Sequence, residues 1–84
     1  MLEISKKIEP LQNDILNILQ LFEYQLNIQS IRQNIINEIA HLLLEANITN
    51  MKIEDISDDE TTYYGHMLMQ FTDMCTKESL TLHF

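Results

Sequence analysis

The stretch SDDETTYYGHMLMQF, residues 57–71, decides the fold class, because it has the pattern of an amphipathic helix with a capped start. Ser57 followed three residues later by Glu60 matches a capping box, and Asp58 and Asp59 suit the positive end of a helix dipole. Apolar side chains then recur at helical spacing, namely Tyr64, Met67, Leu68, Phe71, Met74 and Cys75. The pattern predicts a helix from residue 57 to about residue 76.

Two more amphipathic helices are predicted in the first half of the chain. The first spans about residues 5–26, and the second about residues 28–46. On one helical wheel the two apolar stripes differ by roughly 180°, so one straight helix would change its buried face near Asn27. We therefore expect a hairpin, with Asn27 or Ser30 capping the second helix. One long helix that presents opposite faces to two partners is the alternative.

The remaining segments are short. Residues 47–56 are predicted to connect the second and third helices. The final SLTLHF, residues 79–84, alternates apolar and polar side chains, which fits a short strand or a tail that docks on a partner subunit. One glycine and one proline are few for sheets and tight turns. We therefore predict one all-α domain, residues 1–84, built as a bundle of about three helices: a helical hairpin plus a C-terminal helix.

The net charge of −8, from thirteen acids and five bases, disfavours binding to nucleic acid or to an anionic membrane surface. The bases are scattered, so they form no local basic patch. No apolar run approaches the ~20 residues of a membrane span. Charges near the N-terminus replace the apolar stretch of a signal peptide, and the single cysteine, Cys75, cannot form an internal disulfide. These features predict a cytoplasmic protein. A short chain without disulfide bonds or a structural metal ion often gains buried surface by oligomerising, so these features also predict a homodimer.

Several residues invite a chemical interpretation, and each has a simpler one. His66 has no second ligand three or four residues away on the predicted helix, so a surface histidine is favoured over a metal ligand. Met67 and Met69 face different sides of that helix, which favours packing over copper binding. Cys75 lies on the apolar stripe without a histidine at helical spacing. Glu38 and His41 have the Glu-x-x-His spacing of di-iron bundles, but the chain contains only one such motif.

The strongest functional signal is an acidic stretch followed by two tyrosines. Five of the thirteen acids fall within seven residues, and the predicted partner-binding residues are Glu54, Asp55, Asp58, Asp59, Glu60, Tyr63 and Tyr64. Acids also belong at a helix start on dipole grounds alone. Acids beside tyrosines are nevertheless typical of protein-binding hot spots and would suit a partner with a basic surface.

We therefore predict a protein that acts by binding another protein, as an inhibitor, an antitoxin or immunity protein, or a regulatory adaptor. It is expected to be no enzyme and to carry no cofactor. Two alternatives stay open: a metal-binding helical bundle that uses Glu38 and His41, and a structural component of an assembly or a secretion chaperone.

Overall fold

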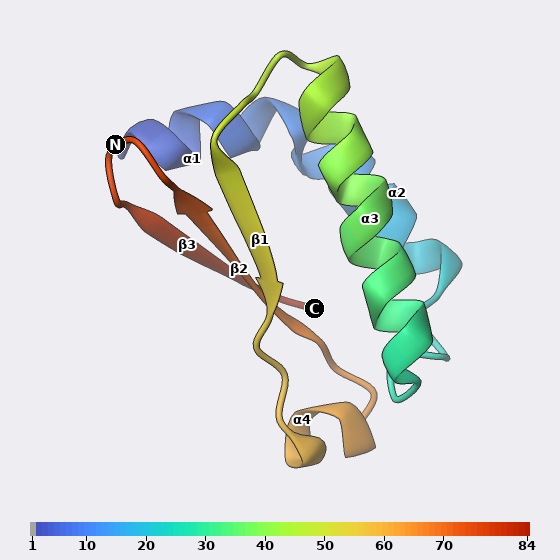
Figure 1. Ribbon diagram of the computed structural model, residues 1–84. Coiled ribbons are helices and arrows are strands. Elements are labelled where there is room, and N and C mark those ends of the chain that lie inside the picture. The colour runs from blue at the N-terminus through green and yellow to red at the C-terminus, as the bar shows by residue number, and fades with distance from the viewer. Residues whose placement is uncertain (1) are drawn as a thin grey trace.

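The computed structural model of the protein describes residues 2–84 as helices packed on one face of a three-stranded antiparallel sheet (Figure 1). In chain order the elements are α1 (Glu3–Ile8), the 3-10 helix η1 (Glu9–Leu11), α2 (Gln12–Leu21), α3 (Gln29–Glu45), β1 (Met51–Asp55), α4 (Asp59–Tyr63), β2 (Leu68–Asp73) and β3 (Ser79–His83). The prediction of an all-α three-helix bundle is therefore wrong, because the chain has an α+β fold. No helix within residues 2–84 is both long enough and apolar enough to cross a membrane.

The first half of the chain follows the predicted hairpin, with one interruption. Pro10 lies in η1, which separates α1 from α2, because proline has no N–H to donate to a regular helix. The loop between Leu21 and Gln29 confirms the break near Asn27 and excludes one long helix. The residue that precedes α3 is Ile28, in extended conformation and without a side-chain cap, so neither Asn27 nor Ser30 caps this helix.

The third predicted helix is replaced by a short helix and a strand. Only residues 59–63 are helical, and the cap is Asp58 rather than Ser57, with Asp58 Oδ1 accepting from the Thr61 N–H at 2.7 Å. Gly65 then takes a φ of +79°, which a helix cannot continue through and which glycine adopts without strain. The chain leaves this turn fully extended, and β2 begins at Leu68.

The core explains why the strand pattern was hidden in the sequence. Alternate residues from Met67 to Asp73 are buried, which is the two-residue period of a half-buried strand. Met67 and Phe71 also fit a helical stripe, and the polar Asp73 conceals the alternation. The supposed stripe residues Met74 and Cys75 are instead exposed, in the turn after β2. The sheet therefore buries one face against the helices.

The two segments that flank β2 in the sheet were the predicted connector and tail. In the register, Phe71 lies between Ile53 of β1 and Leu80 of β3, all on the helix-covered face. The buried core cluster comprises Ile4, Ile8, Ile15, Leu19, Leu26, Ile35, Ile36, Ile39, Leu43, Met67, Met69 and Phe71. The residues 79–84 thus follow the strand alternative, and each strand contributes its alternate apolar residues to a shared core.

A buried carboxylate ties the N-terminal helix to the sheet. Asp73 is fully buried, and its Oδ2 accepts from Lys7 Nζ at 2.7 Å. Its Oδ1 accepts from the Cys75 N–H at 2.9 Å and the Thr76 N–H at 3.3 Å. These bonds satisfy a charge that would otherwise be costly to bury. The hydrogen bond from Lys7 is the main reason that the pKa of Asp73 lies below its ordinary value.

Candidate functional site

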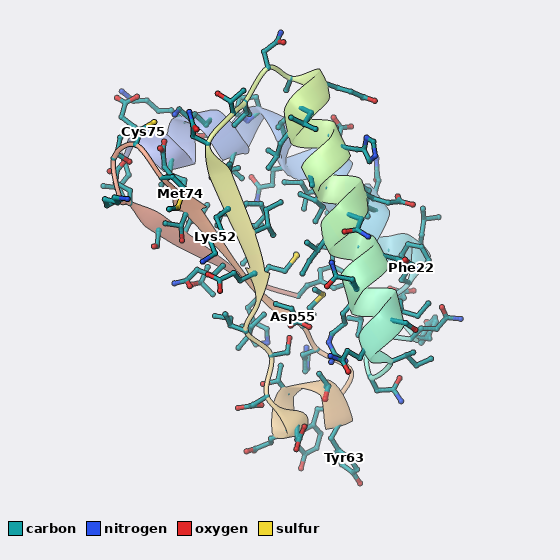
Figure 2. The ribbon with its side chains drawn as sticks, viewed as in Figure 1. Phe22, Lys52, Asp55, Tyr63, Met74 and Cys75 are labelled. Atoms are coloured by element: carbon teal, nitrogen blue, oxygen red, sulfur yellow. The ribbon has the colours of Figure 1, made fainter. Side chains whose placement is uncertain are left out.

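All three tyrosines of the chain lie around one open groove. The groove has a volume of about 460 Å³ and is lined by Glu23, Tyr24, Leu26, Asn27, Thr62, Tyr63, Tyr64 and Gly65; we call it the tyrosine groove. Tyr24, Tyr63 and Tyr64 are 91%, 80% and 67% exposed. Tyr63 projects from α4 at the end of the molecule opposite Cys75 (Figure 2). None of these rings belongs to the buried core, so folding alone does not explain their placement.

One wall of the groove is the loop between α2 and α3. Turn hydrogen bonds from the Gln25 N–H to Phe22 O at 2.9 Å and from the Ile28 N–H to Gln25 O at 3.0 Å bend this loop back on itself. Leu26 is buried and anchors the loop in the core, while Glu23 and Tyr24 remain outside. The loop therefore presents an acid and an aromatic ring side by side in sequence.

The other wall is α4 with the turn that follows it. The rings of Tyr63 and Tyr64 meet edge to face, with centroids 5.1 Å apart. This is a favourable geometry for an aromatic pair, because the positive edge of one ring meets the negative face of the other. The Gly65 N–H donates to Thr62 O and the His66 N–H to Thr61 O, both at 3.0 Å, which closes the turn behind the rings. The turn and the contact between the rings thus set the relative position of the aromatic pair.

Arg32 connects the two walls to the rest of the fold. From α3, its Nη1 donates to Leu26 O at 2.8 Å in the loop, and its Nε donates to Asp55 Oδ2 at 2.7 Å at the end of β1. Asp55 Oδ1 in turn accepts from the Ser57 N–H at 3.0 Å. Ser57 Oγ then accepts from the Leu68 N–H at 2.9 Å, so the strand ends on both sides of α4 are linked. The network therefore sets the position of both groove walls.

The structure divides the predicted acidic patch into three parts. Asp55 is engaged with Arg32, and Asp58 caps α4, so both have structural tasks. Glu54 lies on the sheet next to Lys52, with Glu54 Oε1 3.6 Å from Lys52 Nζ, and does not line the groove. Asp59 and Glu60 are exposed on α4, within one turn of Tyr63. Of the predicted residues, Asp59, Glu60, Tyr63 and Tyr64 are thus exposed at this end and free of these structural tasks.

Glu23 and Tyr24, which line the same groove as the α4 tyrosines, were not among the predicted site residues. Tyr24 falls within the first predicted helix, residues 5–26, whereas it lies in the loop beyond α2. Arg32 links this loop to the end of β1, because it donates both to Leu26 O and to Asp55, 23 positions away, and no local pattern signals that second contact. The sequence held one hint. A buried tyrosine needs a hydrogen-bond partner for its hydroxyl group, which favours a surface position for a residue such as Tyr24.

The other candidate residues do not converge on a site. Glu38 and His41 are exposed on α3, and within residues 2–84 no three potential metal ligands lie close enough to share an ion. A site built on this pair would need ligands from another molecule. His66 is exposed in the link between α4 and β2, and the centroid of its ring lies 5.1 Å from the ring centroid of His83.

Comparison with known proteins adds no relative. No family model matches the sequence, and neither a curated protein nor a solved structure shows significant similarity to it.

Proposed function

We propose that this protein acts by binding another protein through the tyrosine groove. The observation that carries the proposal is the gathering of every tyrosine of the chain, each at least two-thirds exposed, around one concave surface. Contiguous exposed aromatic groups in a monomeric protein typically mark an interaction site. Tyrosine brings a large apolar area, a polar hydroxyl group and only two side-chain torsions to immobilise, which is why it is enriched at binding hot spots.

The charges around the groove favour a basic partner. Glu23 lines the groove, and Asp59 and Glu60 lie on the adjacent α4. None of the four lysines lines it, and the guanidinium of Arg32 is paired with Asp55. The surface is therefore negative in a chain whose net charge is −8. Exposed acids of this kind steer a basic partner toward the surface, and the desolvated rings then hold it.

This mechanism is occlusion of a basic protein surface, without catalysis by the chain itself. It fits an inhibitor, an antitoxin or immunity protein, or a regulatory adaptor that works in the cytoplasm. The proposed partner site differs from the predicted one, because it adds Glu23 and Tyr24 and leaves out three of the predicted acids. It comprises Glu23, Tyr24, Asp59, Glu60, Tyr63 and Tyr64, without Glu54, Asp55 and Asp58.

A comparative capture experiment tests the proposal. Tagged wild-type protein, the Tyr24→Ala/Tyr63→Ala variant and a Leu44→Ala control are incubated with extract of the source cells, and bound proteins are quantified by mass spectrometry. Leu44 is an exposed apolar residue of α3 that does not line the tyrosine groove. We expect a basic protein that the wild type and the control retain and that the double variant loses. Equal recovery on all three baits would contradict the proposal.

A further inference from the structure

The outer edge of β3 carries backbone groups without a partner in the sheet. The Phe84 and Met67 backbones exchange two hydrogen bonds, at 2.7 and 2.9 Å, and the Asp73 N–H donates to Glu78 O at 2.9 Å. In an antiparallel ladder such pairs recur at every second residue, so residues 80 and 82 also bond to β2. The N–H and C=O groups of Ser79, Thr81 and His83 therefore point away from β2. Within residues 2–84 no strand lies beyond β3, which is an edge of the sheet (Figure 1).

An apolar channel runs beside this edge. Two hollows of about 240 and 120 Å³ lie between β3 and the helical segment formed by α1, η1 and α2. Leu82 borders both, and polar groups of Glu9 and Gln12 also line the first. The other apolar residues of the walls are Ile8, Ile15, Leu16, Leu19, Leu80 and Phe84. Leu16 is 40% exposed, and Leu80 and Leu82 are only partly buried. The core is thus incomplete where the strand edge is open.

The opposite edge of the sheet is protected in the usual ways. α3 packs alongside β1 (Figure 1) more extensively than α1 packs against β3, and β1 carries the charged residues Lys52, Glu54 and Asp55. Covering helices and charged side chains are the common means of preventing edge-to-edge pairing. The segment SLTLHF, residues 79–84, contains no acid and no lysine or arginine. β3 therefore has the features of an edge that pairs.

The composition of this edge favours a second copy of this chain as its occupant. Two chains of net charge −8 repel each other wherever their acids meet, so they associate best through a surface without acids. The β3 strand itself contains no acid, whereas Glu78 precedes it and Glu9 lines the 240 Å³ hollow beside it. The strand is also self-complementary. In a two-fold antiparallel arrangement centred on Thr81, the outward groups of Ser79 face those of His83 in the second copy.

We propose that two copies of this chain form a symmetric dimer by antiparallel pairing of their β3 strands, Thr81 against Thr81, which joins the two sheets into one. In this register Leu80 of one copy lies beside Leu82 of the other, on the helix-covered face. The leucines of each copy thereby extend the apolar channel of its neighbour. The contact is isologous, because the same segment serves both copies and the arrangement closes on itself. The tyrosine groove contributes no residue to this edge, so the dimer and the proposed protein binding are tested separately.

Sedimentation equilibrium at micromolar chain concentration tests the dimer. We expect the wild type to show twice the 9.9 kDa mass of the chain. Thr81→Pro removes an outward N–H that the monomer does not use, and Thr81→Lys places like charges opposite each other at the two-fold axis. Both variants should sediment at the monomer mass. Gln70→Lys is the matched control, because Gln70 is the register partner of Thr81, so this substitution adds the same positive charge one strand away from the edge.

Amide hydrogen exchange on the wild type gives a second readout that needs no variant. Pairing should protect the Thr81 N–H from exchange, whereas an isolated chain leaves it free. Circular dichroism identifies any variant that fails to fold, and Thr81→Lys decides the outcome if Thr81→Pro does not fold. A monomeric wild type would overturn the proposal. So would a dimer that persists in folded Thr81→Lys, because the copies would then meet elsewhere.

Discussion

Arg32 Nε lies 2.7 Å from Asp55 Oδ2, and this pair joins α3 to the end of β1. Both side chains are largely shielded from water, with 12% and 21% of their side-chain surfaces exposed. The same guanidinium holds the loop that carries Tyr24, through Leu26 O. The sequence predicts Asp55 as part of an exposed acidic patch. In the structure it is instead a structural residue behind the tyrosine groove.

Removing the guanidinium should therefore destabilise the fold. Arg32→Met keeps much of the apolar stem and leaves Asp55 without its charged donor. We expect a loss of about 2 kcal/mol in the free energy of unfolding, measured by urea denaturation, since hydrogen bonds to charged groups contribute on this scale. Lys52→Met, which breaks an exposed contact to Glu54, should change it by less than about 0.5 kcal/mol. Equal effects of the two substitutions would show that the Arg32 network is not structural.

Ser57 and Asp58 should have separable roles. Ser57→Ala removes the hydroxyl group that accepts from the Leu68 N–H, and should cost about 1 kcal/mol of stability. Asp58→Ala removes the cap of α4, so it should speed amide exchange at Thr61, whose N–H bonds to Asp58 Oδ1. Amide hydrogen exchange measured residue by residue on both variants distinguishes these roles. If Ser57→Ala rather than Asp58→Ala exposes the Thr61 amide, Ser57 is the cap after all.

Acid should weaken the fold through Asp73 and Asp55. The hydrogen bond from Lys7, helped by the Cys75 N–H, lowers the pKa of Asp73. For Asp55, burial acts to raise the pKa, but hydrogen bonds from Ser57 and Arg32 outweigh burial and lower it. In the unfolded chain both groups titrate near the ordinary value of 3.8. Their stabilisation is therefore present above about pH 3.8, and it is lost as the pH falls through the lower pKa values of the folded chain.

Thermal unfolding as a function of pH checks this expectation. The melting temperature of the wild type should fall steeply below about pH 3.8, and Asp73→Asn should flatten that fall, because its amide does not titrate. If the melting temperature falls equally steeply with pH in the wild type and in Asp73→Asn, the Lys7–Asp73 pair does not contribute to the acid sensitivity of the fold.

Rings and acids should affect different rate constants for binding to the captured partner. Asp59→Asn with Glu60→Gln should slow association and reduce its dependence on salt, because exposed charge acts on the encounter. Tyr63→Ala should speed dissociation and leave the fold intact, because Tyr63 lies outside the core. Surface plasmon resonance at several salt concentrations separates the two effects. A Tyr63→Ala variant with unchanged dissociation would place the binding surface elsewhere.

The sequence predicted the first half of the fold better than the second. α3 and the hairpin break follow from long apolar stripes, which a helix of seventeen residues displays clearly. Strands β1 and β2 were not predicted, for a physical reason. Each has only five or six residues, and Asp73 occupies a buried position that Lys7, 66 positions away, makes tolerable. Tyr63 and Tyr64 were predicted as site residues, but Tyr24 was not, because its wall is set by Arg32, which binds Leu26 O in that loop and also Asp55, 23 positions along the chain.

The most direct test of the tyrosine groove as the binding surface is hydrogen–deuterium exchange on the protein alone and on its complex with the captured partner. Binding at the groove should slow exchange in residues 22–28 and 59–66 together, because these two segments form its opposite walls. Exchange in β1 and at the β3 edge should stay unchanged. If the partner instead protects the polar face of the sheet or the β3 edge and leaves both tyrosine segments unaffected, the groove is not the binding surface.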